Sequence, residues 1–132
     1  EKPEGASAVK LANNMVLGCA IAAMGEGFSL VRKYGVDPAT FFDVMTDGLF
    51  ASPAYKVYGN IIAKELYDQA GFTTTLGLKD ANLALAAALA ANVPLPSLNV
   101  YRDRLLGAMA HGEADKDWSV IARDQARASG LQ

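Results

Sequence analysis

A long stretch without proline, residues 5–34, constrains the fold of this chain more than any other feature of its sequence. Proline breaks the backbone hydrogen bonds of a helix interior, and small and apolar residues fill most of this stretch. Gly35 follows it directly, and Arg32 and Lys33 in the last turn complement the helix dipole. We therefore expect one long helix, with the rest of the chain packed around it.

Three polar side chains, Lys10, Asn13 and Asn14, stand near the start of this predicted helix. At helical spacing they share one face with Leu17. An exposed lysine at a helix start would be the ordinary explanation for Lys10. A core helix, however, does not need a lysine and two asparagines at the head of its apolar run. An ammonium group can exchange a proton and carboxamides can orient hydroxyl or carboxylate groups, so the patch predicts a site for a polar ligand.

Five further helices follow from capping signals and from the spacing of apolar residues. Asp37-Pro38 and Ser52-Pro53 each resemble a helix start, and the two prolines within residues 92–96 break the chain between two later helices. The threonines at 73–75 are expected as an extended lead-in, because no partner strand is visible. The expected ranges are about 38–47, 53–66, 76–91, 97–111 and 117–130, with Ser97 and Asp117 as caps of the last two. The sequence predicts an all-α, bundle-like single domain over residues 1–132.

Composition narrows the class of protein. A hydrophobic content of 52% favours a packed helical domain, and a net charge of −2 argues against nucleic acid as a partner. The longest apolar run, residues 15–25, is shorter than the roughly 18 residues that a membrane span needs. With one cysteine, Cys19, and one histidine, His111, no internal disulfide and no metal site are expected, and a cytoplasmic location fits. The first residue is not Met and a helix begins almost at once, so we expect a piece of a longer polypeptide.

A second polar pair, Lys79 and Asp80, interrupts an otherwise apolar helix, and an exposed charged turn would explain it equally well. Phe72, a few residues earlier, is by itself most simply a core aromatic. The Gly-Glu-Gly at residues 25–27 is not a dinucleotide fingerprint, because no strand precedes it and no third glycine follows.

Four motifs in this order resemble the C-terminal domain of the β-hydroxyacid dehydrogenase family. This family includes 3-hydroxyisobutyrate dehydrogenase and tartronate semialdehyde reductase, with 6-phosphogluconate dehydrogenase as a distant relative. The motifs are K-x-x-N-N at residues 10–14, F-x(3)-L-x(2)-K-D at 72–80, V-P-L-P at 93–96 and D-W-S at 117–119. Relatives often carry two glycines where Glu4 and Ala6 stand here, so the chain is expected to enter the first helix by a different path.

The resemblance implies roles for the residues that match. Lys10 corresponds to the general acid/base that exchanges a proton with the substrate hydroxyl or carbonyl. Asn13 and Asn14 correspond to the amides that hold the substrate. The substrate implied is a small hydroxy acid similar to 3-hydroxyisobutyrate, which is oxidised reversibly to its semialdehyde or keto form.

The same resemblance implies that Phe72, Lys79 and Asp80 lie near the cofactor, NAD or NADP. That cofactor would be bound mainly by an N-terminal Rossmann domain that this chain lacks, so the chain alone is expected to be inactive. A homo-oligomer, dimer or tetramer, is also implied. The alternative is a non-catalytic helical dimerisation or interaction module of a nucleotide-binding protein. An imine-reductase relative is disfavoured, because those enzymes usually replace the lysine at the position of Lys10.

Overall fold

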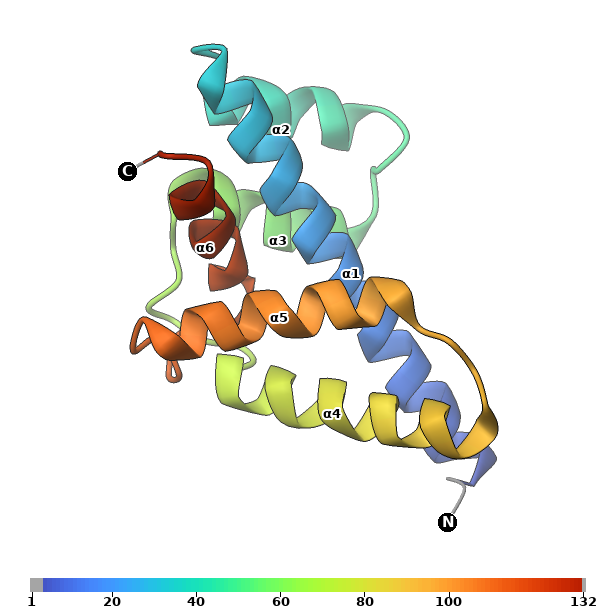
Figure 1. Cartoon of the computed structure of the whole chain (residues 1–132). Helices are drawn as coiled ribbons and strands as arrows, with labels where there is room; N and C mark the ends of the chain where they lie inside the picture. The colour runs from blue at the N-terminus through green and yellow to red at the C-terminus, as the bar shows by residue number, and fades with distance from the viewer. Residues whose placement is uncertain (1–3, 132) are drawn as a thin grey trace.

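The computed structural model of the chain describes residues 4–131, and these form six α-helices and one 3-10 turn, without a strand (Figure 1). The predicted all-α class and the number of helices are confirmed. The elements are α1 (Gly5–Lys33), α2 (Pro38–Asp47), α3 (Pro53–Lys64), α4 (Thr74–Ala91), α5 (Pro96–Ala110), η1 (Trp118–Val120) and α6 (Ile121–Ala128).

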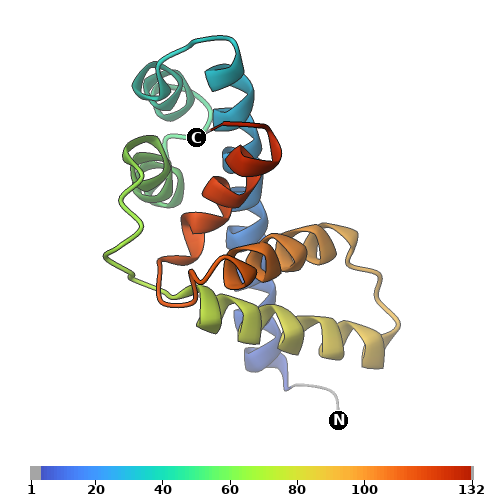
Figure 2. The ribbon, with the colours of Figure 1, turned by 60° about the vertical axis from the view of Figure 1, so that its left-hand side comes forward.

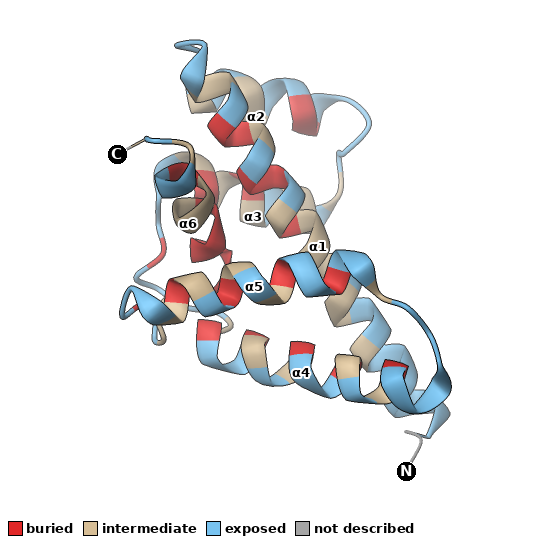
Figure 3. Ribbon diagram, in the orientation of Figure 1, coloured by how far each residue is buried: buried red, intermediate tan, exposed pale blue. Residues whose placement is uncertain are grey.

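Helix α1 is the central element of the domain, because every other helix contacts it. Figures 1 and 2 show α4 and α5 beside its N-terminal half and α2, α3 and α6 around its C-terminal half. Ile21, Met24 and Phe28 on α1 form part of the buried core, whereas residues 5–10 are exposed (Figure 3). The rest of the chain packs around α1 as expected, and the head of the helix, with Lys10, is left exposed.

By length and composition alone, α1 could cross a membrane, a property it shares with many core helices of soluble proteins. In this fold its middle and C-terminal turns pack against protein. The absence of a membrane partner stays a prediction.

The starts of α2 and α3 follow the capping signals, whereas those of α4, α5 and α6 differ from expectation. Asp37 caps α2 as predicted, accepting a 2.9 Å hydrogen bond from the backbone N–H of Ala39. Thr73 caps α4 through its hydroxyl, so Thr74 and the next threonine belong to the helix rather than to an extended lead-in. Helix α5 begins one residue before the predicted Ser97 cap, since Pro96 takes the first helical turn, where proline is favoured.

A clasp of hydrogen bonds joins the segment before α4 to the segment before α6. The backbone N–H of Trp118 donates to the Phe72 carbonyl at 2.8 Å, and that of Thr74 donates to the Lys116 carbonyl at 2.9 Å. The Asp117 carboxylate, which is fully buried, accepts hydrogen bonds from the backbone N–H groups of Ser119 and Gly71 at 3.0 and 3.2 Å. The predicted cap Asp117 is thus confirmed, although it opens the 3-10 turn η1, with α6 beginning only at Ile121. The clasp fixes Phe72 and the start of α4 beside Trp118.

Candidate functional site

The centre of the candidate site is a contact between α1 and α4. The side-chain Nδ2 of Asn14 donates a 3.0 Å hydrogen bond to Oδ2 of Asp80, and both side chains are half-buried. The two residues come from separate sequence motifs. The packing of α1 on α4 therefore brings together two of the six predicted site residues.

Lys10 and Asn13 lie on the exposed N-terminal turns of α1. Lys10 stands one helical turn before Asn14, so its ammonium group and the Asn14 amide share a face. Neither Lys10 nor Asn13 is covered by another element of the described chain. These two side chains are therefore open to solvent or to a body that docks on this face.

The predicted cofactor residues separate into two kinds. Lys79 is exposed on α4, next to Asp80. Phe72 is half-buried and meets the ring of Trp118 edge-on, with centroids 4.8 Å apart. Phe72 is thus a core contact, as its residue type alone suggests. Part of its ring remains exposed.

Two side chains that sequence reasoning did not assign to the site lie immediately behind Asn14 and Asp80. Tyr101 of α5 and Trp118 of η1 line a narrow pocket together with this pair. Burial raises the pKa of Tyr101 far above its usual range, and the neighbouring Cys19 and Asp80 add to the rise, so the phenol stays protonated. A sequence signal for Tyr101 existed in Gly18, since glycine in a helix interior costs stability unless another group needs the space. A Cβ at Gly18 would lie 2.5 Å from the Tyr101 ring.

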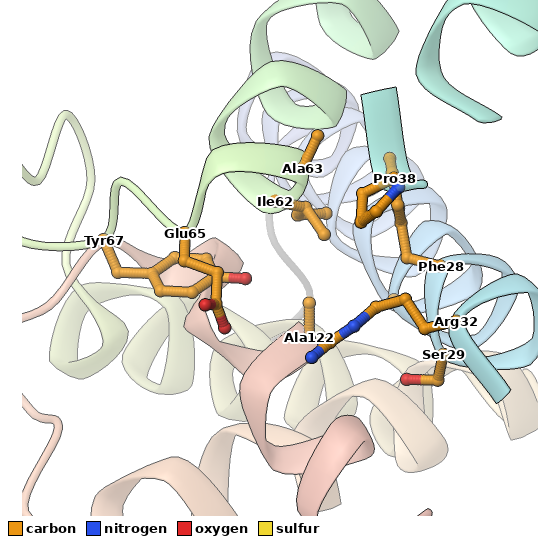
Figure 4. A pocket seen from close by; sticks show the side chains of 10 residues that line it. Phe28, Ser29, Arg32, Pro38, Ile62, Ala63, Glu65, Tyr67 and Ala122 are labelled. Carbon is orange, nitrogen blue, oxygen red and sulfur yellow. The ribbon is translucent and has the colours of Figure 1, made fainter. Parts of the chain in front are cut away.

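A second pocket lies at the other end of α1, between α1, α3 and the start of α6 (Figure 4). Figure 4 shows the side chains of Arg32, Glu65 and Tyr67 around it. Burial raises the pKa of Tyr67, and the charge of Glu65 adds to the rise. This pocket shares no residue with the predicted site. Arg32 and Lys10 stand near opposite ends of α1, and because each helical residue adds roughly 1.5 Å, most of the helix length lies between them.

Within residues 4–131, no three His, Cys, Asp or Glu side chains are grouped so that they could hold a metal ion. The described site residues carry two ammonium groups, two carboxamides, a carboxylate and aromatic rings. Such a set can bind a hydroxyl or carboxylate compound and exchange a proton with it.

Residues 5–124 match the family model described as NAD-binding of NADP-dependent 3-hydroxyisobutyrate dehydrogenase. The chain belongs to this family. The resemblance inferred from the four motifs is thereby confirmed for the family.

Sequence and structure comparisons with individual proteins are consistent with this family. The chain is 35% identical to an uncharacterized oxidoreductase, YfjR, of Bacillus subtilis over 93% of its own length and 43% of that protein. Its fold matches 3-hydroxyisobutyrate dehydrogenase of Salmonella typhimurium with a TM-score of 0.80 at 23% identity, covering 87% of this chain and 40% of that one. A Mycobacterium tuberculosis 3-hydroxyisobutyrate dehydrogenase, solved with L-serine, matches with a TM-score of 0.76 at 29% identity, covering 88% and 42%. The chain thus spans less than half the length of these members of the 3-hydroxyisobutyrate dehydrogenase family.

Proposed function

We propose that this chain is the helical domain of an NAD(P)-dependent β-hydroxyacid dehydrogenase that reversibly oxidises a small hydroxy acid similar to 3-hydroxyisobutyrate. The observation that carries the proposal is the position of Lys10, exposed one turn before the Asn14–Asp80 hydrogen bond. A proton-transfer group and a fixed amide then face the same side of α1. Because the chain covers only part of its relatives, the rest of the activity belongs to a nucleotide-binding Rossmann domain.

In this proposal Lys10 Nζ takes the proton of the substrate hydroxyl during oxidation and returns it to the carbonyl oxygen during reduction. A bound nicotinamide would supply the hydride acceptor for oxidation and the hydride donor for reduction. Asn13, which is exposed, donates hydrogen bonds to the substrate. The Asn14 amide is oriented by Asp80: a carboxylate only accepts hydrogen bonds, so Nδ2 must face it and Oδ1 must face away. That oxygen is then available to accept a hydrogen bond from a donor on the same face of α1, such as the ammonium group of Lys10.

The residues near the expected cofactor fit a dinucleotide in chemical type. Lys79 presents an exposed positive charge that suits an anionic cofactor, and Asp80, beside it, is held by Asn14. Phe72 adds a partly exposed ring that can contact an apolar edge of the cofactor or substrate. The choice between NAD and NADP would be made by the nucleotide-binding domain.

A homo-oligomer is part of the same proposal. Val44 on α2 and Leu49 just after it leave 71% and 96% of their surface exposed. Apolar side chains so fully exposed near one another are typical of a surface that another chain covers. Location in the cytoplasm, with no membrane and no nucleic acid partner, is proposed from the composition alone.

The test uses the full-length protein that contains this chain. We expect the absorbance of reduced nicotinamide to rise when short 3-hydroxy acids are added with NAD or NADP. Simple alcohols without a carboxylate should give much slower reactions, because they lack the group that the carboxamides and the second domain would orient. Nucleotide binding without turnover on any hydroxy acid would contradict the proposal and support the non-catalytic interaction module instead.

A further inference from the structure

The pocket behind Asn14 and Asp80 is small and is lined by both apolar and polar groups. Helices α1, α4 and α5 and the 3-10 turn η1 enclose it. The volume in which the centre of a water molecule fits is about 10 Å³. That is close to the roughly 10–15 Å³ that one water molecule requires. The pocket therefore has the size of a single-water site.

Two polar atoms on its lining residues have no hydrogen-bond partner among residues 4–131. These are Oη of Tyr101 and Nε1 of Trp118, whose residues are only 2% and 3% exposed. A buried donor left without a partner costs about 1–3 kcal/mol, and native proteins contain few of them. Two residues with such donors line one pocket of this size, which points to a shared partner.

Neither ring can easily turn its polar atom elsewhere. The Tyr101 ring fills the space above Gly18, and its Oη lies 3.2 Å from the position that a Cβ at Gly77 would occupy. Trp118 meets the Tyr101 ring edge-on, with centroids 6.1 Å apart, and is held on its other faces by Phe72 and Tyr58. Close packing thus keeps both rings in the lining of the pocket.

The same pocket contains the acceptor that these donors need. Asp80 lines it, and within residues 4–131 its carboxylate accepts one hydrogen bond, from Asn14. A carboxylate has about four lone-pair sites, so capacity remains for a second donor. A water molecule there would accept from an O–H and an N–H and donate to the carboxylate, which satisfies all three groups.

We propose that one ordered water molecule in this pocket joins Tyr101 and Trp118 to the Asp80 carboxylate, and that Tyr101 is a positioning residue for the Asn14–Asp80 pair. The hydroxyl touches neither substrate nor cofactor. It fixes the carboxylate through the water, and the carboxylate fixes the Asn14 amide. The catalytic consequence rests on the proposed function, whereas the water site itself does not.

The first experiment reads the site without activity. Crystal structures of the full-length wild type, Tyr101→Phe and Tyr58→Phe are compared at a resolution that shows ordered water. We expect a water within about 2.5–3.0 Å of Tyr101 Oη and of the Asp80 carboxylate in the wild type. Tyr101→Phe should lose or displace it, and Tyr58→Phe, which removes a hydroxyl from the other tyrosine that packs on Trp118, should retain it. A wild-type pocket without water overturns the proposal, whether or not the variants fold.

The second experiment tests positioning by a double-mutant cycle in the full-length enzyme. Losing one hydrogen bond should lower kcat for Tyr101→Phe by about 2- to 10-fold, with a smaller change in KM. In an Asp80→Asn background the same substitution should change kcat by less than about twofold, because the acceptor is already altered. Equal losses in both backgrounds overturn the positioning role. A wild type without dehydrogenase activity defeats the proposed function and removes the positioning role with it, while the crystal comparison still decides the water site.

Discussion

Asn14 donates a 3.0 Å hydrogen bond to Asp80, a residue 66 positions further along the chain. The neighbouring Asn13 makes no such contact and is exposed. Two adjacent asparagines of the same motif therefore differ in what they do: one is held by α4, and the other is free to reach a ligand.

Asn14→Asp should destabilise the chain, and Asn13→Asp should not. The first substitution replaces a donor by a second carboxylate facing Asp80, so we expect the free energy of unfolding to fall by about 1–3 kcal/mol at neutral pH. The deficit should shrink in acid, because protonation of either carboxyl removes the repulsion and restores a donor. Asn13→Asp serves as the matched control and should stay within about 0.5 kcal/mol. Urea unfolding at both pH values measures this, and equal losses for the two variants would contradict the assigned contact.

Lys10→Met in the full-length enzyme should abolish turnover while leaving nucleotide binding intact. Removing a general acid/base lowers kcat by roughly 10²- to 10⁴-fold. Lys10 is exposed, so its loss should leave the fold unchanged. Lys64→Met, another exposed lysine at the end of α3, is the control and should keep wild-type rates. Turnover is followed by reduced nicotinamide absorbance and binding by titration of its fluorescence; near wild-type turnover in Lys10→Met would refute the assignment.

Gly18→Ala should destabilise the chain despite the better helix propensity of alanine. The added Cβ would lie 2.5 Å from the ring of buried Tyr101, which cannot move without disturbing Trp118. Overpacking of this kind costs typically about 1–3 kcal/mol. Gly5→Ala, where nothing lies within 4 Å of the new atom, should be neutral or slightly stabilising. Thermal and urea unfolding of the two variants give the comparison, and a stabilised Gly18→Ala would show that the close approach is wrong.

Glu113 should contribute to the loss of stability in acid. Its burial alone would raise the pKa, but hydrogen bonds from Arg127 at 2.7 Å and Arg123 at 3.0 Å outweigh this and hold the pKa below the usual 4.5. A carboxyl with a lowered native pKa stabilises the fold fully above its unfolded pKa, and this contribution is lost as the pH falls through the native value. Glu113→Gln should therefore be less stable at neutral pH and lose less stability on acidification below about pH 4.5. Parallel unfolding curves for wild type and variant across this range would contradict the ion pairs, and exposed Glu26→Gln is the control.

Much of the fold was predictable because its signals are local. Capping residues and prolines marked the start of α2 and the break after α4, and residues 5–34 gave α1 to within one position. The helix starts that differ from the prediction are ones where two neighbouring residues could each begin the helix. Thr73 caps α4 with its hydroxyl, and Pro96 begins α5 ahead of the serine that follows it. Residue types alone do not rank such alternatives.

The sequence by itself determined the helices, the family motifs and the face of α1 that carries Lys10, Asn13 and Asn14. Helical periodicity places residues on a face, but it does not say which helix covers that face. Only the tertiary structure decided that α4 meets Asn14 through Asp80, that Lys10 stays exposed, and that Tyr101 fills the space above Gly18. Those contacts join residues far apart in the chain, and they depend on the packing of several helices at once.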